Sequence, residues 1–283
     1  MPVESVRVAA SVVDIAVPSR AGGLPGVSMA GFRGYADGLV DFQMVPYPAL
    51  TIFIDFGDAL LIDGVSGDRK RGSIVVGLAP CSFRGCGRDV DLLQIRLSPV
   101  IAHAVFSVGS ELGGAAVALA DLWGPEARRI QQQLHAAGSW DDRFAIAQSA
   151  IARRRAAGRA VDPEVAFVWG QMMRSRGRVR VERLADEVGW SRKRLWFRFR
   201  DQIGLTPKHA ARLVRFDHAA HRLAAGHSAA LVAADCGFAD QSHMHRDAMA
   251  FAGMTPTAVA EAPWLAVDDI AWPTTKQALP LEG

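Results

Sequence analysis

The 283-residue chain has little of what membrane and secreted proteins usually carry. It contains no run of about eighteen apolar residues, so we expect no membrane-spanning segment and no membrane partner. The N-terminus lacks a charged start followed by an apolar core, so we expect no signal peptide. The three cysteines (Cys81, Cys86 and Cys236) are few and odd in number, which favours a reducing cytoplasm over a disulfide framework.

Histidine is scarce where a metal enzyme would need it. The first 160 residues contain only His103 and His135, and both follow the segments that we expect to be strands. A metal site inside a β-barrel needs a cluster of histidine and carboxylate ligands. We therefore expect no metal, no cofactor and no enzymatic activity, with a metal-dependent barrel enzyme as the alternative.

Charge is distributed unevenly along the chain. From Arg174 to Arg222 there are fourteen Lys/Arg and five Asp/Glu, a local net charge of +9, although the whole chain carries only +3. The remaining residues therefore sum to −6. Such a basic segment is typical of a surface that binds a polyanion, although solvated arginine faces have the same composition.

The two halves of the chain have different periodicities, which predicts an α+β protein of two domains. The first hundred residues alternate short β-branched and aromatic segments with turn residues, as in an antiparallel sandwich or small barrel. The expected strands lie in 49–63 (a hairpin broken at Gly57-Asp58), 71–80 and 89–99, and the expected turns lie at 32–38 and 45–50.

Helical signals follow. Pro125 and Gly138 bound one expected helix, and Ser139 caps the next, with Asp142 completing a capping box. Asp162-Pro163 announces a further helix after a linker at 156–162. The expected bounds are 1–157 for a β-rich domain with trailing helices, 158–261 for an all-α domain, and 262–283 for a C-terminal tail, whose Trp264 and Trp272 are candidates to pack back on the core.

Two segments of the all-α part repeat one pattern. LADEVGWSRKRLWFRFRDQIGLTP (184–207) and VAADCGFADQSHMHRDAMAFAGMTP (232–256) share a Gly-aromatic pair and end in Gly, an apolar residue, Thr and Pro. A short apolar helix, a glycine turn and a second helix capped by Ser191 or Asp240 form a helix-turn-helix. We expect one such unit at 181–204 and another at 228–253, because the repeat implies one supersecondary unit used twice.

The second helix of the first unit has two faces. Leu195 and Phe199 are expected to pack inward, while the opposite face carries cations and flat aromatic side chains and is expected to be exposed. Such a face fits a major groove, where cations meet phosphates or guanine and apolar surface meets thymine methyl groups. Core packing of Trp196 and Phe197 is the alternative. The candidate DNA-binding residues are Arg192, Lys193, Arg194, Trp196, Phe197 and Arg200.

The second unit contains CGFADQSHMHRDAM (236–249), which looks at first like a metal site. His243 and His245 are two positions apart on a helix, so they point to different faces and do not easily chelate one ion. We expect Met244, Ala248 and Phe251 to face inward, and Met249 to fall on the outward arc as a packing residue rather than a reader. Glutamine pairs with adenine, and arginine with guanine or phosphate. The candidate DNA-binding residues are Gln241, Ser242, His245 and Arg246.

Residues 207–226 between the units are expected to form one amphipathic helix that ends at Gly226. The apolar stripe is Leu213, Phe216, Ala220 and Leu223. About nineteen residues span roughly 28 Å. This length approaches the roughly 34 Å between successive major-groove faces of B-DNA, so one chain can present both recognition helices to the same side of a duplex.

Residues 163–260 resemble the two-unit DNA-binding domain of the AraC/XylS family of bacterial transcription regulators. LADEVGWS, the long connecting helix and AADCGFADQSHMHRD…GMTP carry the resemblance. It implies a sequence-specific regulator that binds double-stranded promoter or operator DNA with both recognition helices. The chain departs from the family at Phe197, where many members have a polar or basic residue, and at Ala248, where an aromatic core residue is usual.

The N-terminal half is similar, more weakly, to the cupin-like sensor or dimerisation domain that often precedes this DNA-binding domain. VDFQMVPYPALTIFIDFG, GSIVVGLAP and LLQIRLSPVIAHAVF carry this similarity. It implies modulation by a small-molecule effector or by homodimer formation. The alternatives are a metal-dependent cupin-type enzyme, an architectural or repair protein that binds DNA without controlling a promoter, and a ligand-binding module whose basic half contacts another protein.

Overall fold

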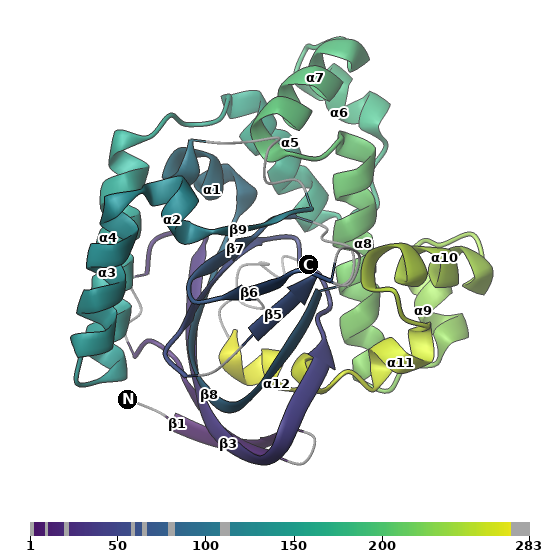
Figure 1. Cartoon of the computed structure of the whole chain (residues 1–283). Helices are drawn as coiled ribbons and strands as arrows, with labels where there is room; N and C mark the ends of the chain where they lie inside the picture. Colours follow the sequence, from purple (N-terminus) through teal and green to yellow (C-terminus); the bar gives the residue numbers. More distant parts are fainter. Residues whose placement is uncertain are drawn as a thin grey trace.

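The computed structural model describes residues 3–8, 11–19, 23–57, 60–63, 67–78, 83–107 and 114–272. Within these residues an antiparallel sheet at the N-terminal end is followed by a helical C-terminal part (Figure 1). The predicted α+β fold class, with its β-rich first domain, trailing helices and all-α second domain, is thus confirmed. The strands are β1 (Val3–Val8), β2 (Ser11–Ala16), β3 (Val27–Gln43), β4 (Leu50–Asp55), β5 (Leu60–Asp63), β6 (Arg69–Arg71), β7 (Ile74–Val76), β8 (Phe83–Leu97) and β9 (Ala116–Ala118).

Strand β8 organises the sheet. It pairs along one edge with β3 and along the other with β4 and β5, giving the order β1-β2-β3-β8-β4-β7-β9, with β5 and β6 off this path. Ile52 lies opposite Ile95, and both are buried. Burying such β-branched and aliphatic side chains on the inner face is the main stabilisation of the sheet.

Two sequence-based expectations for the strands are wrong. Residues 49–63 do not form a hairpin, because β4 and β5 both pair with β8, and a Cβ at Gly57 would lie 2.3 Å from the carbonyl oxygen of Asp89. Residues 32–38 lie inside β3 and are not a turn; the register with β8 shifts there between Tyr35 and Val40. Glycine at these places allows another backbone to come close.

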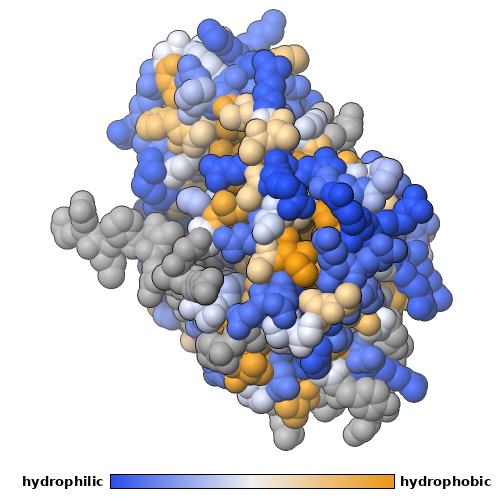
Figure 2. Space-filling model, turned by 90° about the vertical axis from the view of Figure 1, so that its left-hand side faces the viewer, coloured by the Kyte–Doolittle hydropathy of each residue, from blue (hydrophilic) through white to orange (hydrophobic). Residues whose placement is uncertain are grey.

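Within the described residues, one helix lies between β8 and β9, and three more follow β9 before the C-terminal part. Ser139 caps the longest of them by accepting from the Asp142 N–H at 3.1 Å, as the capping pattern predicted. The side of the molecule on which α3 and α4 run shows hydrophobic residues in separate groups among hydrophilic ones (Figure 2), as is normal for a solvent-facing surface. The helices are α1 (Pro99–Phe106), α2 (Leu119–Trp123), α3 (Pro125–Ala136) and α4 (Trp140–Ala157).

The C-terminal part contains two short-helix pairs joined by one long helix (Figure 1). The predicted stripe on the long helix, Leu213, Phe216, Ala220 and Leu223, is buried. The helices are α5 (Pro163–Arg174), α6 (Val181–Glu187), α7 (Arg192–Ile203), α8 (Pro207–Ala224), α9 (Ala229–Asp235), α10 (Gln241–Ala252), α11 (Pro256–Ala260) and α12 (Pro263–Ala271).

Helix α12 packs back on the N-terminal sheet. Val267, Ala271 and Trp272 form a buried cluster with Ile15 and Ala30. The expectation that Trp272 packs on the core is confirmed, while the side chain of Trp264 and the end of the tail lie outside the described residues. The C-terminal segment therefore ties the sheet to the helical part.

A polar cluster forms the centre of this contact, and we call it the interdomain clasp: Tyr47, Arg96, Asp217, His221, Asp268 and Trp272. Asp268 accepts from Arg96 Nη2 at 3.0 Å, and its other carboxylate oxygen lies 2.9 Å from His221 Nε2. Tyr47 donates to Asp268 at 3.2 Å. The Arg96 guanidinium lies 3.5 Å from the ring centroid of Tyr47 and 4.0 Å from that of Trp272. One carboxylate thus joins the sheet, α8 and α12.

Ionisation favours the clasp near neutral pH. Burial lowers the pKa of His221, but the Asp217 charge and the hydrogen bond and charge of Asp268 outweigh it and raise that pKa to about 9. Burial raises the pKa of Asp268, but Arg96 and His221 hold it below its usual value. Asp268 is therefore ionised and His221 protonated at neutral pH.

Candidate nucleic-acid interface

The two predicted units share one turn geometry. Gly189 and Gly237 have φ of +65° and +75°, a conformation that glycine adopts at little cost. The N–H of the following aromatic residue, Trp190 or Phe238, donates at 2.9 Å to a carbonyl five residues earlier in each case. Both aromatic rings are buried. The repeat seen in the sequence is therefore a repeat of structure.

The ends of the recognition helices α7 and α10 also match. Ser191 and Asp240 cap them, accepting from the N–H groups of Arg194 (3.2 Å) and His243 (2.6 Å). Each helix stops at a glycine with positive φ, where the following Thr caps the next helix and Pro occupies its first turn. The shared Gly-x-Thr-Pro thus closes one helix and opens another.

The outward face of α7 carries the side chains that the sequence placed there. Leu195 and Phe199 are buried, whereas Trp196 is 44% and Phe197 62% exposed. The alternative of two core aromatics is therefore wrong. The Arg200 guanidinium lies 5.2 Å from the ring centroid of Trp196, which joins a cation to an aromatic surface. The exposed residues on this helix include all six candidates: Arg192, Lys193, Arg194, Trp196, Phe197 and Arg200.

The outward face of α10 carries the four other candidates. Gln241, Ser242, His245 and Arg246 are all exposed, and Met244, Ala248 and Phe251 are buried as expected. Met249 lies on the outward arc, as expected, but it is 44% exposed, which contradicts the expected packing role. Met249 lies on the exposed side of α10, because Met244, Ala248 and Phe251 occupy the buried side.

The apparent metal cluster is dispersed over this unit. Cys236 is buried beside the turn, and Asp240 is the helix cap. His243 packs edge-on against Phe238 at 5.4 Å between ring centroids, while His245 is exposed. Across the described residues, no group of three or more His, Cys, Asp or Glu is placed to hold a metal ion. Cys81 lies outside the described residues, and Cys86 is buried in β8.

Helix α8 connects the two units and contains 18 residues, which span about 27 Å. Thr206 caps it, accepting from the His209 N–H at 3.3 Å, with Pro207 in the first turn. Burial of its apolar stripe leaves α8 fixed between the units. The separation of α7 and α10 is therefore set by a packed helix.

Some charged residues of the helical part were not recognised from the sequence. Arg198 on α7 and Asp247 on α10 are held in ion pairs with other helices, and His221 and Asp268 belong to the clasp. Their partners lie far away in sequence, up to 221 residues for Tyr47 and Asp268. Helical periodicity assigns such residues to one face of a helix, but it does not show which residues of other elements that face contacts.

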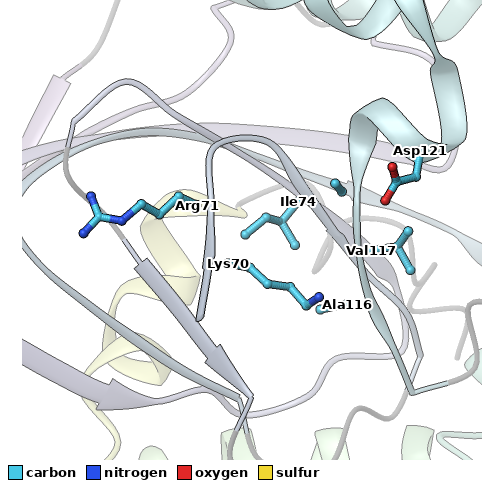
Figure 3. A pocket seen from close by; sticks show the side chains of 7 residues that line it. Lys70, Arg71, Ile74, Ala116, Val117 and Asp121 are labelled. Carbon is cyan, nitrogen blue, oxygen red and sulfur yellow. The ribbon is translucent and has the colours of Figure 1, made fainter. Parts of the chain in front are cut away.

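The N-terminal domain contains a shallow cavity of about 400 Å³ beside β7 and β9 (Figure 3). The Lys70 side chain extends toward Ala116, whereas Arg71 points away from it. The cations Lys70 and Arg71 and the carboxylate Asp121 line this cavity together with apolar residues. The lining residues are Lys70, Arg71, Ile74, Ala116, Val117, Ala118 and Asp121.

Within the described ranges, none of the helices combines the length and the apolar character needed to cross a membrane. A family model described as a helix-turn-helix domain matches residues 184–262. No curated protein sequence matches the chain.

Several solved structures are similar to the chain at low identity. ToxT from Vibrio cholerae O395 is 12% identical, with a TM-score of 0.46, over 85% of this chain and 99% of its own. The C-terminal domain of AraT, a response regulator from Geobacillus stearothermophilus, is 17% identical, with a TM-score of 0.34, over 36% of this chain and 86% of its own. The AraC-like transcriptional activator CuxR is 13% identical, with a TM-score of 0.29, over 71% of this chain and 84% of its own.

The family match begins within α6 and covers the remainder of the first unit, the connecting helix α8 and the whole second unit. Residues 184–262 are thus a helix-turn-helix domain.

Proposed function

We propose that this chain is a sequence-specific transcription regulator that inserts α7 and α10 into two adjacent major-groove segments of double-stranded DNA. One observation carries the proposal: two copies of one unit each expose a polar and basic face, and a packed helix of 18 residues separates them. Its length of about 27 Å is close to the roughly 34 Å of one DNA turn. A modest bend in the DNA makes up the difference.

The exposed side chains suggest separate roles for the two helices. On α7, Lys193 and Arg200 are suited to phosphates, and Trp196 and Phe197 offer apolar surface to thymine methyl groups. On α10, the Gln241 amide is suited to adenine. The remaining polar candidates on α10 are Ser242 and His245, which are suited to phosphates or base edges, and Arg246, which is suited to guanine.

Residues 1–157 are proposed to be the regulatory domain, 158–261 the DNA-binding domain, and 262–283 a C-terminal tail. Regulation by a small-molecule effector is supported by the cavity beside β7 and β9. Homodimer formation through the regulatory domain is the other route by which it would change DNA binding. The proposal gives the chain no catalytic activity and no cofactor.

Selection of bound sequences from a random DNA pool tests the proposal. The purified protein is expected to enrich sites with two conserved blocks about one helical turn apart. The selected duplex is then competed against random DNA at physiological salt. Equal affinity for both would exclude a specific regulator and favour an architectural protein. Repeating the selection with cell extract tests whether an effector changes the affinity.

The metal-dependent alternative has its own measurement. The metal content of the purified protein is expected to be far below one ion per chain. Stoichiometric zinc or iron would contradict the proposal and favour a cupin-type enzyme.

A further inference from the structure

The two recognition helices carry a charged residue at the same inner position. Helices α7 and α10 both contain 12 residues, and the seventh residue of each is Arg198 or Asp247. In each helix an exposed candidate, Phe197 or Arg246, precedes it, and a buried residue follows it. The charged side chain therefore lies at the border between the inner and the outer face.

In the second unit this residue is an acid held by two arginines. Asp247 is 1% exposed and accepts from Arg212 Nη2 at 2.6 Å, from Arg212 Nε at 3.2 Å and from Arg215 Nη2 at 3.1 Å. Both arginines belong to α8, the helix that precedes the unit. The same two side chains also lie over the rings of Phe251 (5.5 Å) and Phe238 (4.5 Å).

In the first unit the same link has the opposite polarity. Arg198 donates from Nε and Nη2 to both carboxylate oxygens of Asp162, at 2.8 and 2.9 Å. Asp162 stands at the start of α5, the helix that precedes this unit, and its N–H donates to Gln202 of α7 at 2.8 Å. The Arg198 hydrogen bonds lower the pKa of Asp162, so the pair is ionic at neutral pH.

Both units therefore have an ion pair between the recognition helix and the helix that precedes the unit. The recognition helix contributes the base in the first unit and the acid in the second. A general need for positive charge near DNA does not explain this, because the second unit has its acid on the recognition helix. A bidentate pair fixes orientation as well as distance. It limits rotation of a recognition helix about its own axis, which would swing the neighbouring exposed side chain along the groove.

We propose that Asp162–Arg198 and Asp247 with Arg212 and Arg215 are positioning contacts that set the angle at which each recognition helix presents its reading face. This inference rests on the proposed function. Each contact governs recognition by its own unit and leaves the other unchanged.

The test measures binding to four duplexes: the selected site, the site with either half scrambled, and the site with both halves scrambled. Asp247→Asn is expected to reduce discrimination at the half-site read by α10 by about tenfold, the size of one good base contact. Asp162→Asn is expected to do the same only at the half-site read by α7. Glu187→Gln, which breaks the exposed pair with Arg183 on α6, is the matched control and leaves both unchanged.

Charge exchange in the first unit gives a second readout, because the side chains of that pair are partly exposed. Arg198→Asp is expected to lose discrimination at its half-site, and Asp162→Arg combined with Arg198→Asp to restore it. A loss equal at both half-sites, or no recovery in the double variant, overturns the proposal. If Asp247→Asn does not fold, the charge-exchange variants at positions 162 and 198 test the proposal by themselves. If the wild-type protein does not distinguish the selected site from random DNA, the proposed function itself has failed.

Discussion

Replacing Asp268 by Asn tests whether the interdomain clasp stabilises the protein. The carboxylate is 5% exposed and accepts from Arg96, His221 and Tyr47. The amide keeps the shape but loses the charge, so Arg96, itself 13% exposed, is left without its counter-ion. Breaking a buried pair by removing one partner costs about 3–5 kcal/mol. This is a large part of a typical stability of about 5–15 kcal/mol.

Urea unfolding followed by tryptophan fluorescence measures the loss, and Trp272 in the clasp reports on it directly. With a slope of about 3 kcal/mol/M, a loss of about 3 kcal/mol lowers the midpoint by about 1 M. Glu261→Gln, at an exposed carboxylate after α11, is the control and is expected to change stability by less than about 0.5 kcal/mol.

The difference in free energy of unfolding between wild type and Asp268→Asn is expected to depend on pH in one direction. The pKa of His221 is raised to about 9 in the folded protein. Its contribution is therefore complete below the unfolded pKa of about 6.5 and is lost as pH rises through about 9. Asp268 contributes above its unfolded pKa and stops contributing in acid. The gap between wild type and Asp268→Asn is expected to be larger at pH 7 than at pH 10. A gap below about 0.5 kcal/mol at pH 7, or one that does not narrow, would refute this account of the clasp.

Three further substitutions test the DNA-binding face and its support. Arg246→Ala is expected to weaken binding to the selected site by about 1–3 kcal/mol and to relax its base preference, and unchanged preference would remove Arg246 from the readers. Arg200→Ala is expected to weaken binding to all sequences and to reduce the slope of log affinity against log salt by about 1, as salt titrations can show. Phe251→Ala removes a ring that is 2% exposed and stacked on Phe216 at 5.4 Å, and calorimetry is expected to find a loss of about 3–5 kcal/mol.

The helical part of the fold could be predicted because its signals are local. Gly189 and Gly237 mark turns, Ser191 and Asp240 mark caps, and Gly-x-Thr-Pro marks each helix boundary. All of these act within a few residues, so the helix limits follow from the sequence. The inward and outward faces then follow from the helical period.

The sheet was harder to predict because some of its glycines lie inside strands, where they make room for a neighbouring element, and do not mark turns. Gly34 was expected in a turn, but a Cβ there would lie 2.6 Å from the carbonyl oxygen of Val12 on the adjacent strand. A Cβ at Gly31 would lie 2.4 Å from the Trp140 ring. These glycines allow a neighbouring strand or helix to pack closely on β3, and only the tertiary structure shows which element comes close.

Helix α8 makes charged contacts that its helical periodicity does not reveal. Arg212 and Arg215 point to α10, while Asp217 and His221 point to the clasp. All four lie within ten residues of one helix whose apolar stripe is buried. The contact proposed to position α10 and the contact that joins the N-terminal sheet to the helical part therefore share one buried helix. Arg96 in β8 and Asp247 in α10 are thus both linked to α8, the first through Asp268 and His221 and the second through Arg212 and Arg215.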